Sequence, residues 1–235
     1  MTEVLYMKDI EGNYIKEFDA KVIKKRDNYV VLDKSAFYPL GGGQPSDTGV
    51  LKWSGGESKV AEVQKKGIIK HIITGEMPEG EVHGILDWDK RYAHMKMHTA
   101  QHVISGVVYD IYNARTVGNQ IHADHSRVDF YPVNLSEEDL KTVENASNEV
   151  ISRNADVKIY EEERESLEKR TDPLRSNLDL IPASIKNLRI VEITGFDVCP
   201  CAGTHVKTTA ELGTLKIIKK ENKGKDKERI IYTLQ

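Results

Sequence analysis

The chain has 235 residues, with 34 Lys and Arg against 37 Asp and Glu, and its formal net charge is −3. This length predicts one large or two small domains, and the ordinary apolar content excludes collagen-like, coiled-coil and disordered classes. The near-neutral charge excludes a protein that coats nucleic acid nonspecifically, but it permits RNA binding through a local basic patch.

The two cysteines, Cys199 and Cys201, are two positions apart, so a disulfide between them would be strained. We therefore expect free thiols or metal ligands, and a reducing, cytoplasmic location. No stretch approaches the roughly 18 consecutive apolar residues of a membrane span, and the first residues lack the features of a signal peptide. The sequence predicts no contact with a membrane.

Residues 1–86 predict a domain of short strands. Eleven of the 17 glycines lie in this part of the chain, and short apolar runs, several of them alternating with polar residues, lie between them. Such runs, punctuated by Gly, Pro and Asn, are typical of a small β-barrel. The predicted strands are residues 20–23, 29–32, 49–53, 60–63, 68–73 and 82–86.

Residues 87–235 predict an α+β domain. A long helix is expected from Asp89 onward, with Asp89 as its N-cap and no Gly or Pro within residues 90–105. An apolar stripe at helical spacing extends from Met97 to Ile111, and Gly106 is tolerated but weakens the later part of the helix. A second helix is expected from the N-cap Ser136 to about residue 154. Strands are expected at residues 157–161, 188–193 and 212–218, and residues 214–220 and 230–234 predict a hairpin.

Three histidines, His94, His98 and His102, recur at every fourth position of the first predicted helix. Residues four apart lie about 5–6 Å from each other on one helix face, so two imidazoles can reach one zinc ion. The outer two are separated by about 12 Å of helix rise. The ligand pair is therefore either His94 with His98 or His98 with His102, and a solvated helix face is the alternative.

A second candidate ligand pair lies in the segment Cys199-Pro200-Cys201-Ala202-Gly203-Thr204-His205. A thiolate and an imidazole on either side of a Gly-containing turn form a metal-binding hook, and two ligand pairs make one tetrahedral set. Two buried cysteines beside a loop histidine are the alternative. A zinc protease of the HExxH type is excluded, because Thr99 stands where that motif carries Glu.

The motifs His98-Thr99-Ala100-Gln101-His102 and Cys201-Ala202-Gly203-Thr204-His205 together resemble the editing domain of alanyl-tRNA synthetase. The upstream segment of residues 37–49, FYPLGGGQPSDTG, matches the glycine-rich segment of that family. Residues 126–130, SRVDF, resemble its Arg-x-Asp-Phe strand. Order and spacing agree over about residues 20–220, and the chain is similar to the freestanding, medium-length members of the family, the AlaX type.

This resemblance implies a zinc-dependent hydrolase that removes wrongly attached serine from tRNA(Ala), with glycine as a second candidate substrate, and spares alanine. It also implies one zinc per chain, held by His98, His102, Cys201 and His205, with His94 and Cys199 outside the set. Two other functions remain open. These are a zinc-stabilised RNA-binding module without activity and a threonyl-type editing domain.

The resemblance further implies three catalytic candidates, Gln44, Thr116 and Arg127. The preceding Gly41, Gly42 and Gly43 would let the backbone approach the aminoacyl end of the tRNA, and a Gln side chain offers both donors and an acceptor. A tight strand connection is the alternative role of the glycines. Thr116 would bond the serine hydroxyl or be an ordinary turn residue, and Arg127 would support the site or pair with Asp129.

A basic run near the C-terminus is the leading candidate for tRNA phosphate contacts. Between residues 216 and 229 it carries seven positive and three negative side chains, a local net charge of +4. The alternative is a solvated loop, and the clusters 24–26 and 65–66 are weaker candidates. The lysines expected to bind tRNA are Lys219, Lys220, Lys223 and Lys225.

Overall fold

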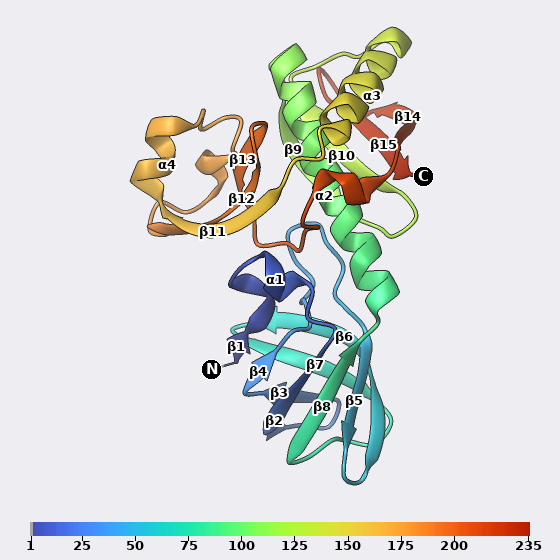
Figure 1. Cartoon of the computed structure of the whole chain (residues 1–235), viewed down its shortest axis with the longest axis vertical. Coiled ribbons are helices and arrows are strands. Elements are labelled where there is room, and N and C mark those ends of the chain that lie inside the picture. Colours follow the sequence, from blue (N-terminus) through green and yellow to red (C-terminus); the bar gives the residue numbers. More distant parts are fainter. Residues whose placement is uncertain (1) are drawn as a thin grey trace. The chain divides into compact units, whose positions relative to one another are not determined.

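The computed structural model describes residues 2–235 and shows an α+β chain, which confirms the predicted fold class. The chain forms two compact units, one ending at His94 and the other beginning at Met95. This boundary falls within the long helix α2 (Trp88–Tyr112), and the sequence-based boundary after residue 86 lies just ahead of the same helix. Figure 1 shows helix α2 in green.

Six strands of the first unit close into a barrel in the order β2-β3-β7-β6-β5-β8 (Figure 1). Each of them contains one of the six predicted strands, so the prediction of a small β-barrel is confirmed. A short β1 (Glu3–Val4) pairs in parallel with β4 (Lys34–Ser35) beside it. The barrel strands are β2 (Glu17–Lys25), β3 (Tyr29–Leu32), β5 (Gly49–Trp53), β6 (Gly56–Lys66), β7 (Ile68–Thr74) and β8 (Glu81–Leu86).

Alternating residues of these strands fill the barrel interior, as a period of two requires. Leu32, Leu51 and Val60 are completely buried there. His71 lies in the same core, where its Nε2 is 2.8 Å from the Ser35 hydroxyl. Burial lowers the pKa of His71 to about 4, so the ring is neutral and is held by hydrogen bonds rather than by charge.

A buried arginine fastens the first turn of α2 to the loops of the same unit. Arg91 is fully buried and pairs with Asp47, whose carboxylate Oδ1 lies 3.0 Å from Arg91 Nε. Its other guanidinium nitrogens donate to the carbonyls of Asn13 at 2.9 Å and Ala36 at 2.6 Å. Asp47 in turn accepts from the backbone N–H of Tyr38 at 2.7 Å. One ion pair therefore ties α2 to both sides of the glycine-rich segment.

The second unit contains two sheets and two longer helices. The helix α3 (Glu137–Ser152) and the part of α2 after His94 lie beside a four-stranded sheet with the order β14-β15-β10-β9. A separate sheet has the order β11-β12-β13. The short α4 (Arg164–Arg170) follows β11. The strands are β9 (Arg115–Gln120), β10 (Ser126–Tyr131), β11 (Val157–Glu163), β12 (Asn187–Ile193), β13 (Asp197–Pro200), β14 (Leu215–Asn222) and β15 (Glu228–Leu234).

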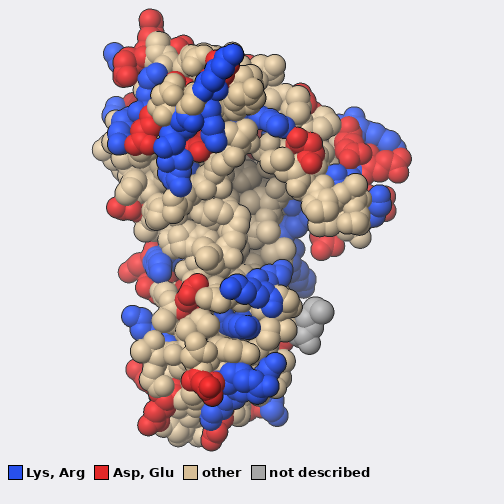
Figure 2. Space-filling view, turned by 180° about the vertical axis from the view of Figure 1, so that it is seen from behind, with Lys and Arg blue, Asp and Glu red and all other residues tan. Residues whose placement is uncertain are grey.

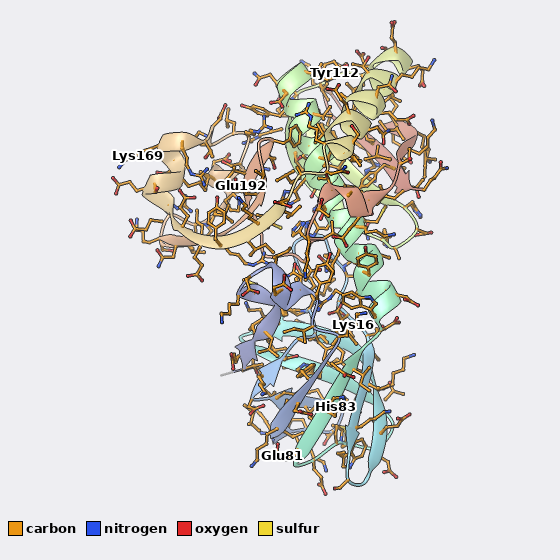
Figure 3. The ribbon with its side chains drawn as sticks, in the orientation of Figure 1. Lys16, Glu81, His83, Tyr112, Lys169 and Glu192 are labelled. Atoms are coloured by element: carbon orange, nitrogen blue, oxygen red, sulfur yellow. The ribbon has the colours of Figure 1, made fainter. Side chains whose placement is uncertain are left out.

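Helix α3 begins after Ser136, as predicted. Ser136 and Asp139 form a capping box, in which each side chain bonds the backbone N–H of the other. Tyr112, at the end of α2 and labelled in Figure 3, donates to the Asp139 carboxylate at 2.8 Å. The start of α3 and the end of α2 are therefore held by the same carboxylate.

Two local expectations were wrong, the N-cap of the long helix and the start of one strand. Helix α2 starts at Trp88, so Asp89 lies inside its first turn rather than capping it. The helix continues to Tyr112 through Gly106, which was expected to be tolerated but to weaken its later part. A Cβ at Gly106 would lie 2.7 Å from the Phe196 ring, so only glycine fits this contact. The strand expected from residue 212 starts at Leu215, because a capped 3₁₀ turn, Thr209–Leu212, precedes it. None of the helices in the described part of the chain combines the length and the apolar composition that a membrane span requires.

Candidate metal centre

Four side chains from two distant segments converge in the second unit. The possible ligand atoms of His98, His102, Cys201 and His205 all lie within 4.8 Å of one another. Cys201 Sγ is 3.6 Å from His98 Nε2 and 3.4 Å from His205 Nε2. The three histidines are almost completely buried. This arrangement can hold one metal ion.

Helix α2 supplies one half of the set, and of the two pairs left open by the sequence it is His98 and His102 that belong to the group. Their ring centroids are 5.5 Å apart, as expected for residues four apart on a helix. His94 is not part of the group. The apolar stripe on another face of the helix, which includes Ala100, Ile104 and Val107, is buried and fixes the rotation of the helix.

The other half comes from the loop after β13. The Cys201 N–H donates to the Arg189 carbonyl at 3.1 Å, which continues the pairing of β12 with β13 for one residue. The chain then turns, and the Gly203 N–H points to Cys201 Sγ at 3.3 Å. This bond favours a negatively charged sulfur. The turn brings His205 back to the same point.

The two cysteines differ in charge. Burial raises the pKa of Cys201, but the neighbouring His98, His102 and His205 outweigh it and place that pKa well below its usual range. Burial raises the pKa of Cys199 well above its usual range, and its thiol points to the Ser176 carbonyl at 3.7 Å. Cys201 is thus a thiolate able to bind a metal, whereas Cys199 keeps its proton.

A hydroxyl fixes the tautomer of His205. The Thr99 hydroxyl has one proton, which it donates to the Met95 carbonyl at 3.0 Å. It must therefore accept at its 3.1 Å contact with His205 Nδ1, so this nitrogen carries the hydrogen and the lone pair of Nε2 is available to bind a metal ion. Burial lowers the pKa of His205 to about 3, which keeps the ring neutral.

A carboxylate orients His102. Buried Asp197 Oδ2 lies 3.7 Å from His102 Nδ1, and Arg175 Nε donates to its other oxygen at 3.1 Å. Arg175 also pairs with Asp110 on α2. Burial lowers the pKa of His102, but Asp197 and Cys201 outweigh it and raise that pKa to about 10, so an incoming metal ion must displace a proton. The sequence analysis missed both Thr99 and Asp197 as supports of the ligands.

Thr116 lies in a chain of polar side chains that begins on α2. Gln101 Nε2 donates to the Ser105 hydroxyl at 2.6 Å, and this hydroxyl is 2.7 Å from the Thr116 hydroxyl. Asn119 donates to Gln101 at 3.3 Å. If Ser105 donates to Thr116, the proton of Thr116 remains for another acceptor. If Thr116 donates instead, its lone pairs remain for another donor.

Arg127 and Asp129 do not pair with each other. Arg127 donates to Gln120 on the neighbouring β9 at 2.8 Å. Asp129 instead receives two bonds from Arg229, its direct partner on β15, the shorter at 2.6 Å. The ion pair considered in the sequence analysis therefore exists with a different arginine, and Arg127 remains a candidate for the site.

The glycine-rich segment forms a tight turn within the first unit. Gly41 and Gln44 exchange backbone hydrogen bonds at 2.9 and 3.2 Å, with Gly42 and Gly43 between them. Both central glycines have positive φ, +58° and +78°, as this kind of two-residue turn requires. The structural role of the glycines is thus confirmed. Gln44 itself is buried, and its part in binding stays a prediction.

Carboxylates surround most cations of the C-terminal hairpin β14–β15. Lys219 and Lys223 lie 2.9 and 3.9 Å from Glu221, and Lys220 lies 3.7 Å from Glu228. Lys216 pairs with Glu144, outside the hairpin. Figure 2 shows Lys and Arg side chains interleaved with Asp and Glu on several parts of the surface. These pairs reduce the positive field that the hairpin presents, and its contact with tRNA stays a prediction.

Two family models match the chain. One, described as the threonyl and alanyl tRNA synthetase second additional domain, matches residues 188–231. This range contains all but the first residue of β12, the Cys201–His205 hook and most of the hairpin. The other, described as tRNA synthetases class II (A), matches residues 3–89 and so covers the barrel.

Full-length relatives separate the alanyl from the threonyl type. The alanyl-tRNA editing protein AlaX-M of Methanosarcina barkeri is 43% identical, over 100% of this chain and 99% of its own. That of Saccharolobus solfataricus is 41% identical over 100% of both chains. The alanine–tRNA ligase of Thermococcus kodakarensis is 38% identical over 98% of this chain and 25% of the ligase. The chain therefore belongs to the alanyl-tRNA editing proteins of the AlaX-M type, a family of deacylating hydrolases.

Proposed function

We propose that this protein is a zinc-dependent hydrolase that removes serine from wrongly charged tRNA(Ala), accepts glycine as a second substrate and spares alanine. The observation that carries the proposal is the convergence of His98, His102, Cys201 and His205 in a member of the AlaX-M family. Its two free cysteines fit a reducing, cytoplasmic setting.

The donor set fits zinc. One thiolate and three imidazoles are ligands that suit this ion. Zinc–sulfur and zinc–nitrogen bonds of about 2.3 and 2.0–2.1 Å, at a tetrahedral angle, place sulfur and nitrogen about 3.6 Å apart. Cys201 Sγ lies 3.6 and 3.4 Å from the two nearest imidazole nitrogens. When bound, zinc supplies a Lewis acid that can polarise an ester carbonyl.

Selection of serine requires polar groups that the hydroxyl satisfies and the methyl of alanine leaves unpaired. We assign this role to Thr116, because Ser105 and Gln101 fix its hydroxyl and leave it one further bond to make. On the strength of the family resemblance, Gln44 and Arg127 remain proposed catalytic residues, with Gly41, Gly42 and Gly43 as proposed contacts of the aminoacyl end.

We expect release of serine and glycine from charged tRNA(Ala), and little or none of alanine. Release of serine from wrongly charged tRNA(Thr) should also be absent. The measurement is deacylation of the four radiolabelled substrates by zinc-loaded protein. Failure to release any amino acid, with tRNA binding retained, would favour an inactive RNA-binding module. Release of serine from tRNA(Thr) alone would favour the threonyl type.

Single substitutions assign the roles within the same assay. Thr116→Val keeps the volume of the side chain but removes its hydroxyl. It should slow serine release about tenfold, the effect of losing one hydrogen bond of about 1.4 kcal/mol, and leave glycine release nearly unchanged. Equal slowing for both amino acids would contradict a role in reading the serine hydroxyl. Gln44→Ala should slow both reactions with zinc content intact.

We also expect the residues behind the ligands to set the affinity for zinc. Asp197→Asn and Thr99→Val remove the partners of His102 and His205 and should each weaken zinc binding about 10–100-fold. Competition against a chelating dye measures this without any substrate. Asp124→Asn, an exposed Asp of the same unit, is the control. Unchanged affinity in both variants would show that the ligands need no such support.

A further inference from the structure

The outer surface of the barrel contains a hollow with an apolar lining and a cationic rim. Its volume is about 320 Å³, at the small end of the range for ligand pockets. Val31 and Ile69 form buried parts of its lining, and Ile23 and Ile68 expose 51% and 38% of their surface. Lys24, at the end of β2, lies on one side. Figure 2 shows groups of Lys and Arg on the barrel surface.

The strand order of the barrel brings the two weaker basic clusters of the sequence to this one hollow. Strand β2 pairs with β3, β3 with β7, and β7 with β6, so Lys24 on β2 and Lys65 on β6 both line it. Lys66 follows at the turn between β6 and β7, where it opposes Ile68. All three lysines are exposed.

These cations are free of carboxylates, in contrast to those of the hairpin. Within residues 2–235, Lys24, Lys65 and Lys66 have no ion pair, and the Arg26 guanidinium donates to the Lys25 carbonyl rather than to a carboxylate. Lys25 is the one member of the basic clusters that pairs with an acid, Glu79. The hairpin has more lysines, but most of their charge is compensated by nearby acids. Of the two basic regions, the barrel therefore has more lysines without a nearby carboxylate.

We propose that this surface, the barrel patch of Ile23, Lys24, Lys65, Lys66 and Ile68, binds the tRNA. Phosphates contact the lysines, and one unstacked nucleotide lies against the isoleucines. An apolar surface flanked by cations complements an RNA strand, in which each base lies between two phosphates. The proposal rests on the proposed function, since it takes the polyanion to be the substrate.

The test compares variants that each lose three lysines from a different part of the surface. Lys24, Lys65 and Lys66 are changed together to Gln, which keeps most of each side chain, and binding of uncharged tRNA(Ala) is measured as a function of KCl concentration. Each lost phosphate contact reduces the steepness of log Kd against log salt by about 0.7–0.9, so the slope should fall by about 2–3. The control changes Lys21, Lys52 and Lys59, exposed lysines of the same barrel, and should keep the wild-type slope.

A second pair of variants tests the hollow itself. Ile23→Gln should weaken tRNA binding at every salt concentration without changing the slope. Ile218→Gln, on an equally exposed hairpin residue, should not. If both variants bind tRNA with the affinity of the wild type, no nucleotide lies in the hollow, and that part of the proposal is overturned.

The remaining outcomes separate this proposal from the proposed function. A hairpin triple variant changes Lys219, Lys223 and Lys225 to Gln. If this variant has a reduced slope while the barrel triple variant keeps the wild-type slope, the tRNA lies on the hairpin. The barrel patch is then overturned, although the proposed editing function is not. If the barrel variant deacylates with a raised KM and an unchanged kcat, the patch acts only in binding. Absence of tRNA binding and of deacylation in the wild type would overturn both proposals.

Discussion

Cys201→Ser should leave the purified protein with far less than one equivalent of zinc, whereas Cys199→Ser should retain close to one. Cys201 is the only thiolate of the group, and its sulfur lies within 3.6 Å of two imidazole nitrogens. Loss of a supporting residue already weakens a metal site about 10–100-fold, so loss of the thiolate should weaken it by more. Metal analysis after dialysis against a weak chelator gives the content directly.

The two cysteines are a matched pair for this measurement. They are two residues apart, both partly buried, and differ in what surrounds the sulfur. Cys199 lies beside the Ser176 carbonyl, which favours the protonated thiol, and outside the ligand group. Equal loss of zinc from both variants, with unchanged circular dichroism, would overturn the ligand assignment. Retention of zinc by Cys201→Ser would do the same.

The ligand residues were predictable because their spacing encodes local geometry. Two histidines four apart on a helix share a face in any fold, so His98 and His102 could be paired without knowing what lies opposite. The choice against His94 needed the family motif. The six barrel strands were predictable for a similar reason, since alternation and glycine positions are local signals.

The residues behind the ligands could not be predicted, because their partners are distant in sequence. Asp197 reaches His102 across 95 positions, and Arg175 reaches Asp197 only after α4 and the following turns are placed. The neutralisation of Lys216 by Glu144 depends in the same way on α3 lying beside β14. A sum of charges along the sequence therefore overstated the positive field of the hairpin.

Gly106 has a low helix propensity, yet α2 continues through it to Tyr112, as the apolar stripe of the helix allows. The sequence could not show why a glycine stands there, because the reason is its contact with the distant Phe196 ring. The 3₁₀ turn before β14 could have been predicted from the sequence. Thr208 and Glu211 have the spacing of a capping box, and both of its hydrogen bonds form. This signal was overlooked.

Arg91→Met should destabilise the barrel unit by about 3–5 kcal/mol, the cost of leaving one member of a buried ion pair without its partner. Arg91 and Asp47 expose 0% and 1% of their side chains, so water cannot replace the lost contacts. The substitution also leaves the carbonyls of Asn13 and Ala36 without their donor. Both tryptophans, Trp53 and Trp88, lie in this unit, so their fluorescence during urea unfolding reports on it selectively.

The double variant Arg91→Met with Asp47→Asn identifies the cause of the loss. Asn keeps an acceptor for the Tyr38 N–H but removes the unpaired charge, so the double variant should be more stable than Arg91→Met alone. Arg26→Met, at an exposed position of the same barrel, should change stability by no more than about 0.5 kcal/mol. Because the ligands lie in the other unit, zinc content should stay at one equivalent throughout. A loss from Arg91→Met as small as that from Arg26→Met would show that the pair does not hold the glycine-rich segment to α2.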